Sequence, residues 1–111
     1  MIGIDIISIE RFKDVKESDF PSWEKFFTED EWRYAFDSAH TAERLAGIFA
    51  AKEAVMKAVG AAVVKRYDLI EIIHNFEGAP TVHLAIGEKK YIVVSISHDA
   101  GLAVAIAQIE R

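Results

Sequence analysis

The spacing of hydrophobic residues changes twice along the chain. Residues 1–8 form an isoleucine-rich run that is typical of a largely buried strand, although periodicity alone does not exclude a helix. From residue 8 to residue 60 the apolar positions recur at helical intervals, and after residue 66 they follow the spacing of strands. The sequence therefore predicts an α+β fold, in which an N-terminal strand and several helices precede a largely antiparallel sheet.

Local signals place the first helices. A short helix is expected after Ser8, which can cap it, and a second one over residues 19–27. Thr28 and Glu31 have the spacing of a capping box, in which each side chain bonds the backbone of the other residue. A helix is therefore predicted over residues 29–38.

The longest helix is predicted over residues 41–60, with Gly60 at its C-terminal end. Strands are then expected over residues 69–76, 81–86, 91–97 and 102–109. Turns are expected at residues 77–80, 87–90 and 98–101.

Composition narrows the class of protein. The chain has 111 residues, of which 51% are hydrophobic and 28% charged, as expected for one globular domain over residues 1–111. No apolar run is long enough to span a bilayer, and no basic leader precedes the first strand. The absence of cysteine fits a cytoplasmic protein and excludes thiol chemistry. A net charge of -5 argues against general nucleic-acid binding.

The long predicted helix carries charges in an otherwise apolar stretch. Glu53 and Lys57 are four residues apart and therefore share one face of the helix. They could line a site, or they could form an ordinary surface ion pair. Lys52 points elsewhere and is expected to be solvated.

Asp5 is a carboxylate inside an isoleucine-rich strand. Burying it is costly unless it is paired, protonated or bound to a cation, and the alternative is that it faces solvent. Asp5 and Glu53 together could bind one Mg²⁺ ion, which often takes one or two carboxylates plus phosphate oxygens. Lys57 would then meet the same phosphates, provided that the first strand adjoins the long helix.

A second group of polar residues ends a predicted strand. Ser95, Ser97 and His98 could all donate hydrogen bonds to an anion, or could simply be the polar end of a strand. No G-x-S-x-G motif is present, which argues against a nucleophilic serine. The remaining histidines show no metal-ligand spacing.

Several short motifs occur in a fixed order along nearly the whole chain. They are GIDI at residues 3–6, LAG at 45–47, FAAKEA at 49–54, KA at 57–58, Gly60, GAP at 78–80 and SISH at 95–98. In their order and spacing they resemble the holo-acyl-carrier-protein synthase type of 4'-phosphopantetheinyl transferases.

The resemblance implies an activity and a metal. The family moves the phosphopantetheine arm of coenzyme A onto a serine of an acyl carrier protein and releases adenosine 3',5'-bisphosphate, a step that serves fatty acid biosynthesis. Asp5 and Glu53 would be Mg²⁺ ligands, and Lys57 would contact the coenzyme's pyrophosphate. The serine needs a base, which is either Glu53 or a metal-bound water.

The resemblance also implies how coenzyme A and the carrier are bound. Gly78 and Pro80 would border the adenine, and His98 would help to hold the 3'-phosphate. Arg11 falls where the family places a basic residue that meets the carrier protein. The family is a homotrimer, with each active site between two subunits.

The chain departs from the family pattern at three places. Ile48 stands where the family usually has an arginine, and residues 61–66 are bulkier than the usual glycine-bearing loop. Ala79 stands in the middle of the turn at residues 78–80, where the family often has a lysine. These differences support an alternative function, in which a weak or inactive relative acts as a coenzyme A-binding or interaction module.

Overall fold

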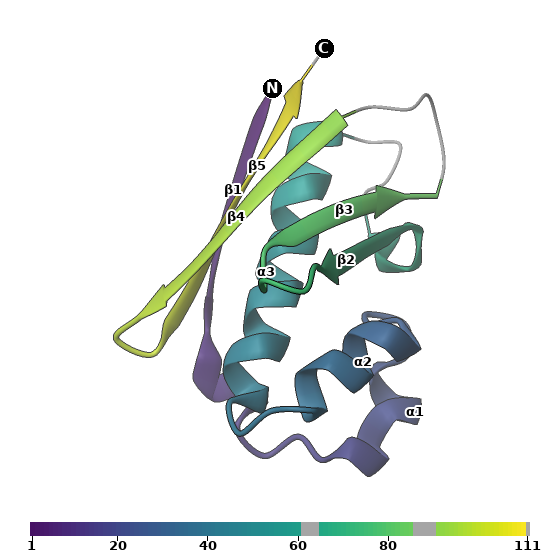
Figure 1. The fold of residues 1–111 in the computed structure, drawn as a ribbon, viewed down its shortest axis with the longest axis vertical. Helices are drawn as coiled ribbons and strands as arrows, with labels where there is room; N and C mark the ends of the chain where they lie inside the picture. Colours follow the sequence, from purple (N-terminus) through teal and green to yellow (C-terminus); the bar gives the residue numbers. More distant parts are fainter. Residues whose placement is uncertain (61–64, 86–90, 111) are drawn as a thin grey trace.

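The computed structural model describes residues 1–60, 65–85 and 91–110. It contains strands that form two antiparallel sheets, with one long helix between them (Figure 1). The predicted connection at residues 87–90, and most of the loop after Gly60, lie outside the described residues. The predicted α+β class is confirmed, and its single sheet is replaced by two sheets.

The larger sheet joins the two ends of the chain. Its strands are β1 (Ile2–Ser8), β5 (Leu102–Glu110) and β4 (Tyr91–Asp99), in that spatial order. Both pairings are antiparallel, and they place Asp5 opposite Ala105 and Ile4 opposite Ile106. The strand expected over residues 91–97 extends two residues further than predicted, because β4 and β5 continue into a tight hairpin.

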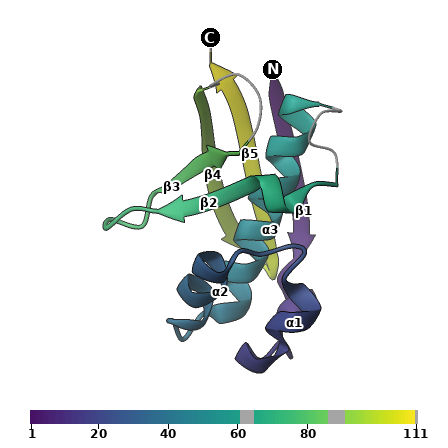
Figure 2. The same ribbon diagram turned by 90° about the vertical axis from the view of Figure 1, so that its right-hand side faces the viewer.

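The smaller sheet is a hairpin of β2 (Ile70–His74) and β3 (Pro80–Leu84), which lies across the opposite side of the long helix (Figure 2). Its turn is fixed by Asn75, whose side-chain oxygen accepts hydrogen bonds from the backbone N–H groups of Glu77 and Ala79. This connection matches the turn expected at residues 77–80.

The helical segments agree with the sequence where caps are strong. They are η1 (Ile9–Phe12), η2 (Glu17–Asp19), α1 (Phe20–Trp23), α2 (Glu29–Phe36), α3 (Thr41–Val59) and η4 (Tyr67–Leu69). Thr28 and Glu31 form the predicted capping box, and Gly60 ends α3 with a φ of 96° that favours glycine. No helix within the described residues has the length and apolar character to cross a membrane.

Two local predictions are wrong. Ser8 precedes η1, but its side chain makes no capping hydrogen bond. The helix expected over residues 19–27 is reduced to η2 and the four residues of α1. Its aromatic residues pack into the core instead of continuing a helical face: Phe12, Trp23 and Phe27 have ring centres 5.4–6.2 Å apart.

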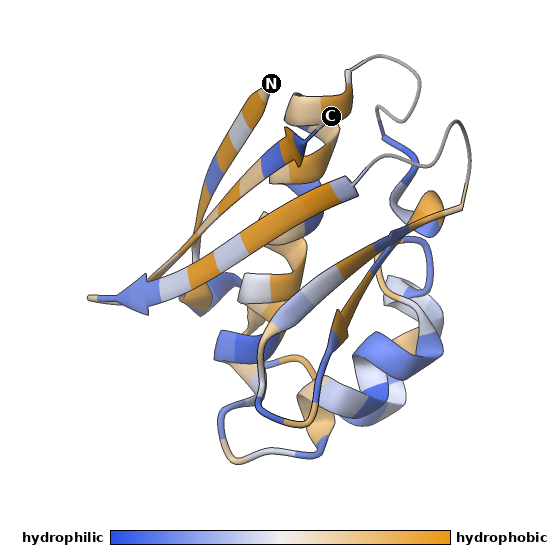
Figure 3. Cartoon of the chain, turned by 45° about the horizontal axis from the view of Figure 1, so that its top comes forward, coloured by the Kyte–Doolittle hydropathy of each residue, from blue (hydrophilic) through white to orange (hydrophobic). Residues whose placement is uncertain are grey.

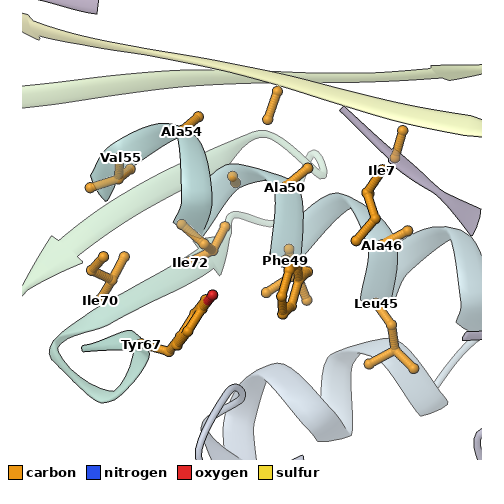
Figure 4. Close-up of a cluster of buried hydrophobic side chains, with 14 of the residues drawn as sticks. Ile7, Leu45, Ala46, Phe49, Ala50, Ala54, Val55, Tyr67, Ile70 and Ile72 are labelled. Carbon is orange, nitrogen blue, oxygen red and sulfur yellow. The ribbon is translucent and has the colours of Figure 1, made fainter. Parts of the chain in front are cut away.

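Small residues bring α3 close to the larger sheet. Fully buried alanines line the contact on both sides: Ala46, Ala50, Ala54 and Ala58 on α3, and Ala103, Ala105 and Ala107 on β5. Figure 4 shows three of the helix alanines directed toward the sheet, while Leu45, Phe49 and Val55 point to the other side of the helix. Because methyl side chains occupy little space, the backbones approach closely and the large side chains fill the core between α3 and the smaller sheet.

Gly3 of β1 packs tightly against the backbone of α3. A Cβ atom at this position would lie 1.9 Å from the Ala54 carbonyl oxygen and 2.8 Å from the Ala58 nitrogen. We expect Gly3→Ala to lower the free energy of unfolding by about 3 kcal/mol or more, because helix backbone cannot move aside cheaply. Gly47→Ala is the control, since its Cβ would meet only the Ile96 side chain, at 3.1 Å. Equal denaturant midpoints for the two variants would contradict this account of the β1–α3 contact.

The isoleucines of β1 are not buried as a set, contrary to the prediction. Gly3, Asp5 and Ile7 face α3, whereas Ile2, Ile4 and Ile6 are 58–62% exposed. Figure 3 shows hydrophobic residues along the three strands of the larger sheet. The face turned away from α3 is therefore apolar and uncovered; we call it the outer sheet face, formed by Ile2, Ile4, Ile6, Leu102 and Ile106.

Lys52 is fully buried, so the prediction of a solvated side chain is wrong. Its Nζ lies 2.6 Å from Glu31 Oε1 and donates hydrogen bonds to the carbonyl oxygens of Phe26 and Tyr67. Glu31 is buried as well, and it also accepts from the Ile72 N–H at 2.7 Å. Burial lowers the pKa of Lys52 and raises that of Glu31, while their mutual attraction opposes both shifts. The pair joins α2, α3 and β2.

Candidate active site

Asp5 and Lys57 meet where β1 packs on α3. Lys57 Nζ lies 3.1 Å from Asp5 Oδ1 and donates a 2.9 Å hydrogen bond to the Ile4 carbonyl oxygen. The Asp5 side chain is 17% exposed and that of Lys57 is 53% exposed. Asp5 is therefore paired and partly buried. The partner of Lys57 is Asp5 and not Glu53, so the surface pair that the helical spacing allowed is not formed.

Glu53 lies one helical turn before Lys57 and contacts an aromatic side chain. The Tyr67 hydroxyl, from η4, donates a hydrogen bond to Glu53 Oε1. Burial is the main cause that raises the pKa of Tyr67 above its ordinary value, followed by this hydrogen bond and by the charges of Glu53 and Asp5. Both carboxylates therefore act on one phenol. We call Asp5, Glu53 and Lys57 the carboxylate cluster.

Arg11 borders the carboxylate cluster. It is exposed, and its guanidinium carbon lies 5.6 Å from the centre of the Phe49 ring, within range of a cation–π interaction. Its positive charge also acts to lower the pKa of Tyr67, against the larger effects that raise it. A basic side chain thus stands at the edge of a site that otherwise presents carboxylates.

The other residues predicted for coenzyme binding line a separate cavity. This open cavity has a volume of about 300 Å³ and is lined by residues of α2, α3, the β2–β3 hairpin and β4; we call it the α3–β4 pocket. Gly78, Pro80 and His98 all line it, together with Ile48. The structure therefore brings the three predicted residues together, and it places the unusual isoleucine beside them.

A carboxylate stands between two histidines in the α3–β4 pocket. Glu43 Oε2 lies 3.7 Å from His98 Nε2 and 3.9 Å from His40 Nδ1. Both imidazoles are more than half exposed and lie near the pocket. When protonated they would carry positive charge toward an anion, while Glu43 would compete for that charge.

One wall of the α3–β4 pocket is a stack of three side chains. The Tyr34 and His74 rings are parallel, with centres 4.0 Å apart, and the Arg44 guanidinium lies 4.1 Å from the Tyr34 ring centre. Arg44 also donates a 2.7 Å hydrogen bond to the Tyr34 carbonyl oxygen. Burial, followed by the charge of Arg44, lowers the pKa of His74. This wall offers flat, partly cationic surface to a planar ligand.

The two groups of predicted residues do not meet within one chain. None of the carboxylate cluster lines the α3–β4 pocket. Glu43 and Glu53 are ten residues apart on α3, which corresponds to about 15 Å along the helix axis. A ligand that touches both groups must therefore be long, or must lie between two copies of the chain.

The donor atoms of the carboxylate cluster fit a hard divalent cation. Lys57 bonds one oxygen of Asp5, and Tyr67 bonds one oxygen of Glu53, so the described residues leave the second oxygen of each carboxylate free of hydrogen bonds. The described ranges contain no group of three or more His, Cys, Asp or Glu side chains placed to hold a metal. The two free carboxylate oxygens suit Mg²⁺, which commonly takes only one or two carboxylates and completes its shell with water and phosphate oxygens.

Sequence reasoning missed several of these residues. Tyr67 carries no local signal, since its contact with Glu53 depends on how η4 packs against α3. His40 and Glu43 could have been noticed from their i,i+3 spacing at the start of a helix. The stack of Tyr34, His74 and Arg44 joins three elements, and no spacing within one of them indicates it.

Comparison with known proteins defines the class. The model of the 4'-phosphopantetheinyl transferase superfamily matches residues 1–107. The chain therefore belongs to this superfamily and is an enzyme of its holo-acyl-carrier-protein synthase type.

Individual relatives match this chain over nearly their whole length. The chain is 41% identical to a holo-acyl-carrier-protein synthase from Caldicellulosiruptor bescii, covering 99% of this chain and 97% of the relative. The holo-acyl-carrier-protein synthase of Helicobacter pylori, solved in complex with coenzyme A, is 35% identical with a TM-score of 0.79, covering 99% and 100% of the two chains. That of Bacillus anthracis, solved with coenzyme A (3',5'-ADP), is 34% identical with a TM-score of 0.78, covering 98% and 94%.

Proposed function

We propose that residues 1–111 form one domain that transfers 4'-phosphopantetheine from coenzyme A to a serine of an acyl carrier protein, with Mg²⁺ as the required ion. The observation that carries the proposal is the carboxylate cluster, in which Asp5 and Lys57 meet at 3.1 Å beside Glu53. Two carboxylates and one ammonium suit a reaction at a pyrophosphate, because they can hold a cation and neutralise phosphate charge together. Such an activity would serve fatty acid biosynthesis in the cytoplasm.

In the proposed reaction the serine oxygen attacks the phosphorus that carries the pantetheine arm. A new serine–phosphorus bond forms, the pyrophosphate bond breaks, and adenosine 3',5'-bisphosphate leaves. Lys57 is half exposed and can turn from Asp5 toward the leaving phosphate, where its charge stabilises the departing oxygen. The serine proton passes to a base, for which Glu53 and a water molecule are both suited.

Asp5 and Glu53 would hold the Mg²⁺ ion through their second carboxylate oxygens, as the hydrogen bonds of the first oxygens suggest. When bound, the ion would withdraw charge from the pyrophosphate oxygens. Tyr67 would then keep the Glu53 carboxylate oriented toward this region.

The α3–β4 pocket would take the adenosine end of coenzyme A. Gly78 and Pro80 offer a flat edge for adenine, and His98 with His40 would face the 3'-phosphate. Ile48 supplies no charge there. Within one chain this pocket lies apart from the carboxylate cluster. We therefore propose a homotrimer, in which the pocket of one subunit and the carboxylate cluster of its neighbour form each active site.

The outer sheet face supports this assembly. Five large apolar residues are 39–62% exposed on one surface, and such a surface is costly for a small domain to leave in water. The chain should therefore behave in solution as an assembly of three 12.4 kDa subunits. Arg11, at the edge of the carboxylate cluster, would be available to meet an acidic carrier protein.

Oligomeric state can be tested with a pair of matched substitutions. We expect Ile106→Lys to give monomers, because a charge on the outer sheet face cannot be buried between subunits. Ile73→Lys is the control, since Ile73 is 46% exposed but belongs to β2 of the smaller sheet. Light scattering after gel filtration at micromolar concentration measures the masses. A monomeric parent chain, or a trimeric Ile106→Lys variant, would contradict the proposed assembly.

Transfer itself is tested by mass spectrometry. The chain is incubated with coenzyme A, Mg²⁺ and a set of apo carrier proteins, and the expected result is a carrier that gains one phosphopantetheine group. The same mixture with a chelator should show no gain. If no carrier is modified, the proposed reaction is wrong; calorimetry with coenzyme A alone then tells a binding module from a chain that does not recognise the coenzyme.

A further inference from the structure

Tyr67 connects the carboxylate cluster to the core. Its hydroxyl donates a hydrogen bond to Glu53 Oε1. The residue is only 7% exposed, and its ring packs on Phe49 and Phe26, with ring centres 5.4 and 5.0 Å away. Figure 4 shows the ring lying among the core side chains below α3. The rigid aromatic packing leaves the hydroxyl little freedom, so the position of Glu53 is coupled to the position of this ring.

The backbone of Tyr67 is fixed as firmly as its ring. Its carbonyl oxygen accepts a hydrogen bond from Lys52 Nζ, the buried ammonium that is paired with Glu31. Lys52 and Glu53 are neighbours on α3 but point to different sides of the helix. Lys52 therefore fixes the main chain of Tyr67, and the Tyr67 hydroxyl in turn fixes the carboxylate of Glu53.

From this arrangement we infer that Tyr67 is a positioning residue, which aims the free oxygen of Glu53 toward the Mg²⁺ and phosphate site through its hydroxyl. A metal-binding carboxylate without such a partner rotates among several rotamers, and side chains that orient metal ligands commonly change metal affinity or activity by about 10- to 100-fold when removed. The inference rests on the proposed function, because it assumes that Glu53 binds the ion.

The structure separates this role from simple packing. Removing the hydroxyl leaves the ring contacts with Phe49 and Phe26 and the carbonyl bond to Lys52 in place. Tyr67→Phe should therefore fold with a melting temperature close to that of the parent chain. A merely structural hydroxyl would change stability and leave the response to Mg²⁺ as it was.

The test compares Tyr67→Phe with the parent chain in two measurements. The first is the transfer rate as a function of MgCl₂ concentration at saturating coenzyme A and carrier. The second is direct binding of Mn²⁺ in the presence of coenzyme A, followed by its electron paramagnetic resonance signal. We expect the half-saturating metal concentration to rise about tenfold or more in both, with the KM for coenzyme A changed less than twofold. Tyr91→Phe, at an exposed position on β4, is the matched control.

The possible results distinguish this inference from the proposed function. If the parent chain neither transfers phosphopantetheine nor binds metal, the proposed function is wrong, and so is the inference that rests on it. If the parent chain transfers with Mg²⁺ and Tyr67→Phe shows the same metal dependence in both measurements, only the role of Tyr67 is wrong. A tenfold weaker metal response together with an unchanged melting temperature would establish the positioning role.

Discussion

Lys57→Ala should slow phosphopantetheine transfer by about 100-fold or more, whereas Asp5→Ala should abolish it. Loss of one charge that stabilises a leaving group commonly costs this much in rate, and loss of a metal ligand removes the ion as well. Metal binding should therefore survive in Lys57→Ala and disappear in Asp5→Ala. Transfer rates by mass spectrometry and Mn²⁺ titration of the two variants separate these effects.

Stability should respond weakly to both changes. The Asp5–Lys57 pair is partly exposed, so breaking it should alter the free energy of unfolding by no more than about 1 kcal/mol. Lys25→Ala, at an exposed position away from the cluster, is a control for the loss of one positive charge. A Lys57→Ala enzyme with parental rates would remove Lys57 from the mechanism. A large loss of stability in Asp5→Ala would instead make Asp5 a structural residue.

Lys52→Met should destabilise the fold by about 3–5 kcal/mol, because it leaves the buried Glu31 carboxylate without its partner. The double variant Lys52→Met/Glu31→Gln should recover part of this loss, since the uncompensated charge is then gone. Arg33→Met is the matched control. Arg33 and Asp30 form an ion pair at 3.1 Å, but both side chains are about three-quarters exposed, so the loss of this pair should cost less than about 1 kcal/mol. Denaturant unfolding of the three variants measures the differences.

The loss in Lys52→Met should also depend on pH. Burial already raises the pKa of Glu31 above its ordinary value of 4.5, and removing Lys52 takes away the largest opposing effect. A carboxyl group whose pKa is higher in the folded chain binds more protons there, so its contribution to stability is present at low pH and is lost as the pH rises. Lys52→Met should therefore approach the parent chain in stability as the pH falls from 7 toward 5. An unchanged difference across this range would contradict the buried-carboxylate explanation.

Much of the secondary structure is encoded in short segments. Two or three neighbouring residues predict the capping box of Thr28 and Glu31 and the end of the long helix at Gly60, and the structure has both. Helix caps and strand alternation depend on hydrogen bonds and periodicity within a few residues, so a single sequence displays them. The short aromatic segment over residues 19–27 was mistaken for a full helix because its tertiary packing outweighs local propensity.

The sequence predicts which residues form the candidate site, but it brings Asp5 to Glu53 and Lys57 only on the condition that the first strand adjoins the long helix. Ordered motifs indicated Asp5, Glu53, Lys57 and His98 as chemistry-bearing positions. Helical spacing allowed an ion pair of Lys57 with Glu53 as one alternative, whereas the structure pairs Lys57 with Asp5, 52 residues away. It also showed that His98 belongs to a pocket apart from the carboxylate cluster.

The sequence alone was sufficient for the order of elements, the α+β class and the family, because these depend on local patterns and on ordered motifs. Only the tertiary structure decided that the strands form two sheets, that Lys52 is a buried partner of Glu31, and that Tyr67 holds Glu53. The contacts of Lys52 and of Tyr67 join residues 14 or more positions apart, and their formation depends on how α3 packs against neighbouring elements. Hydrophobic periodicity indicates which face of a helix is apolar. The shape of the assembled core determines which polar groups are buried together.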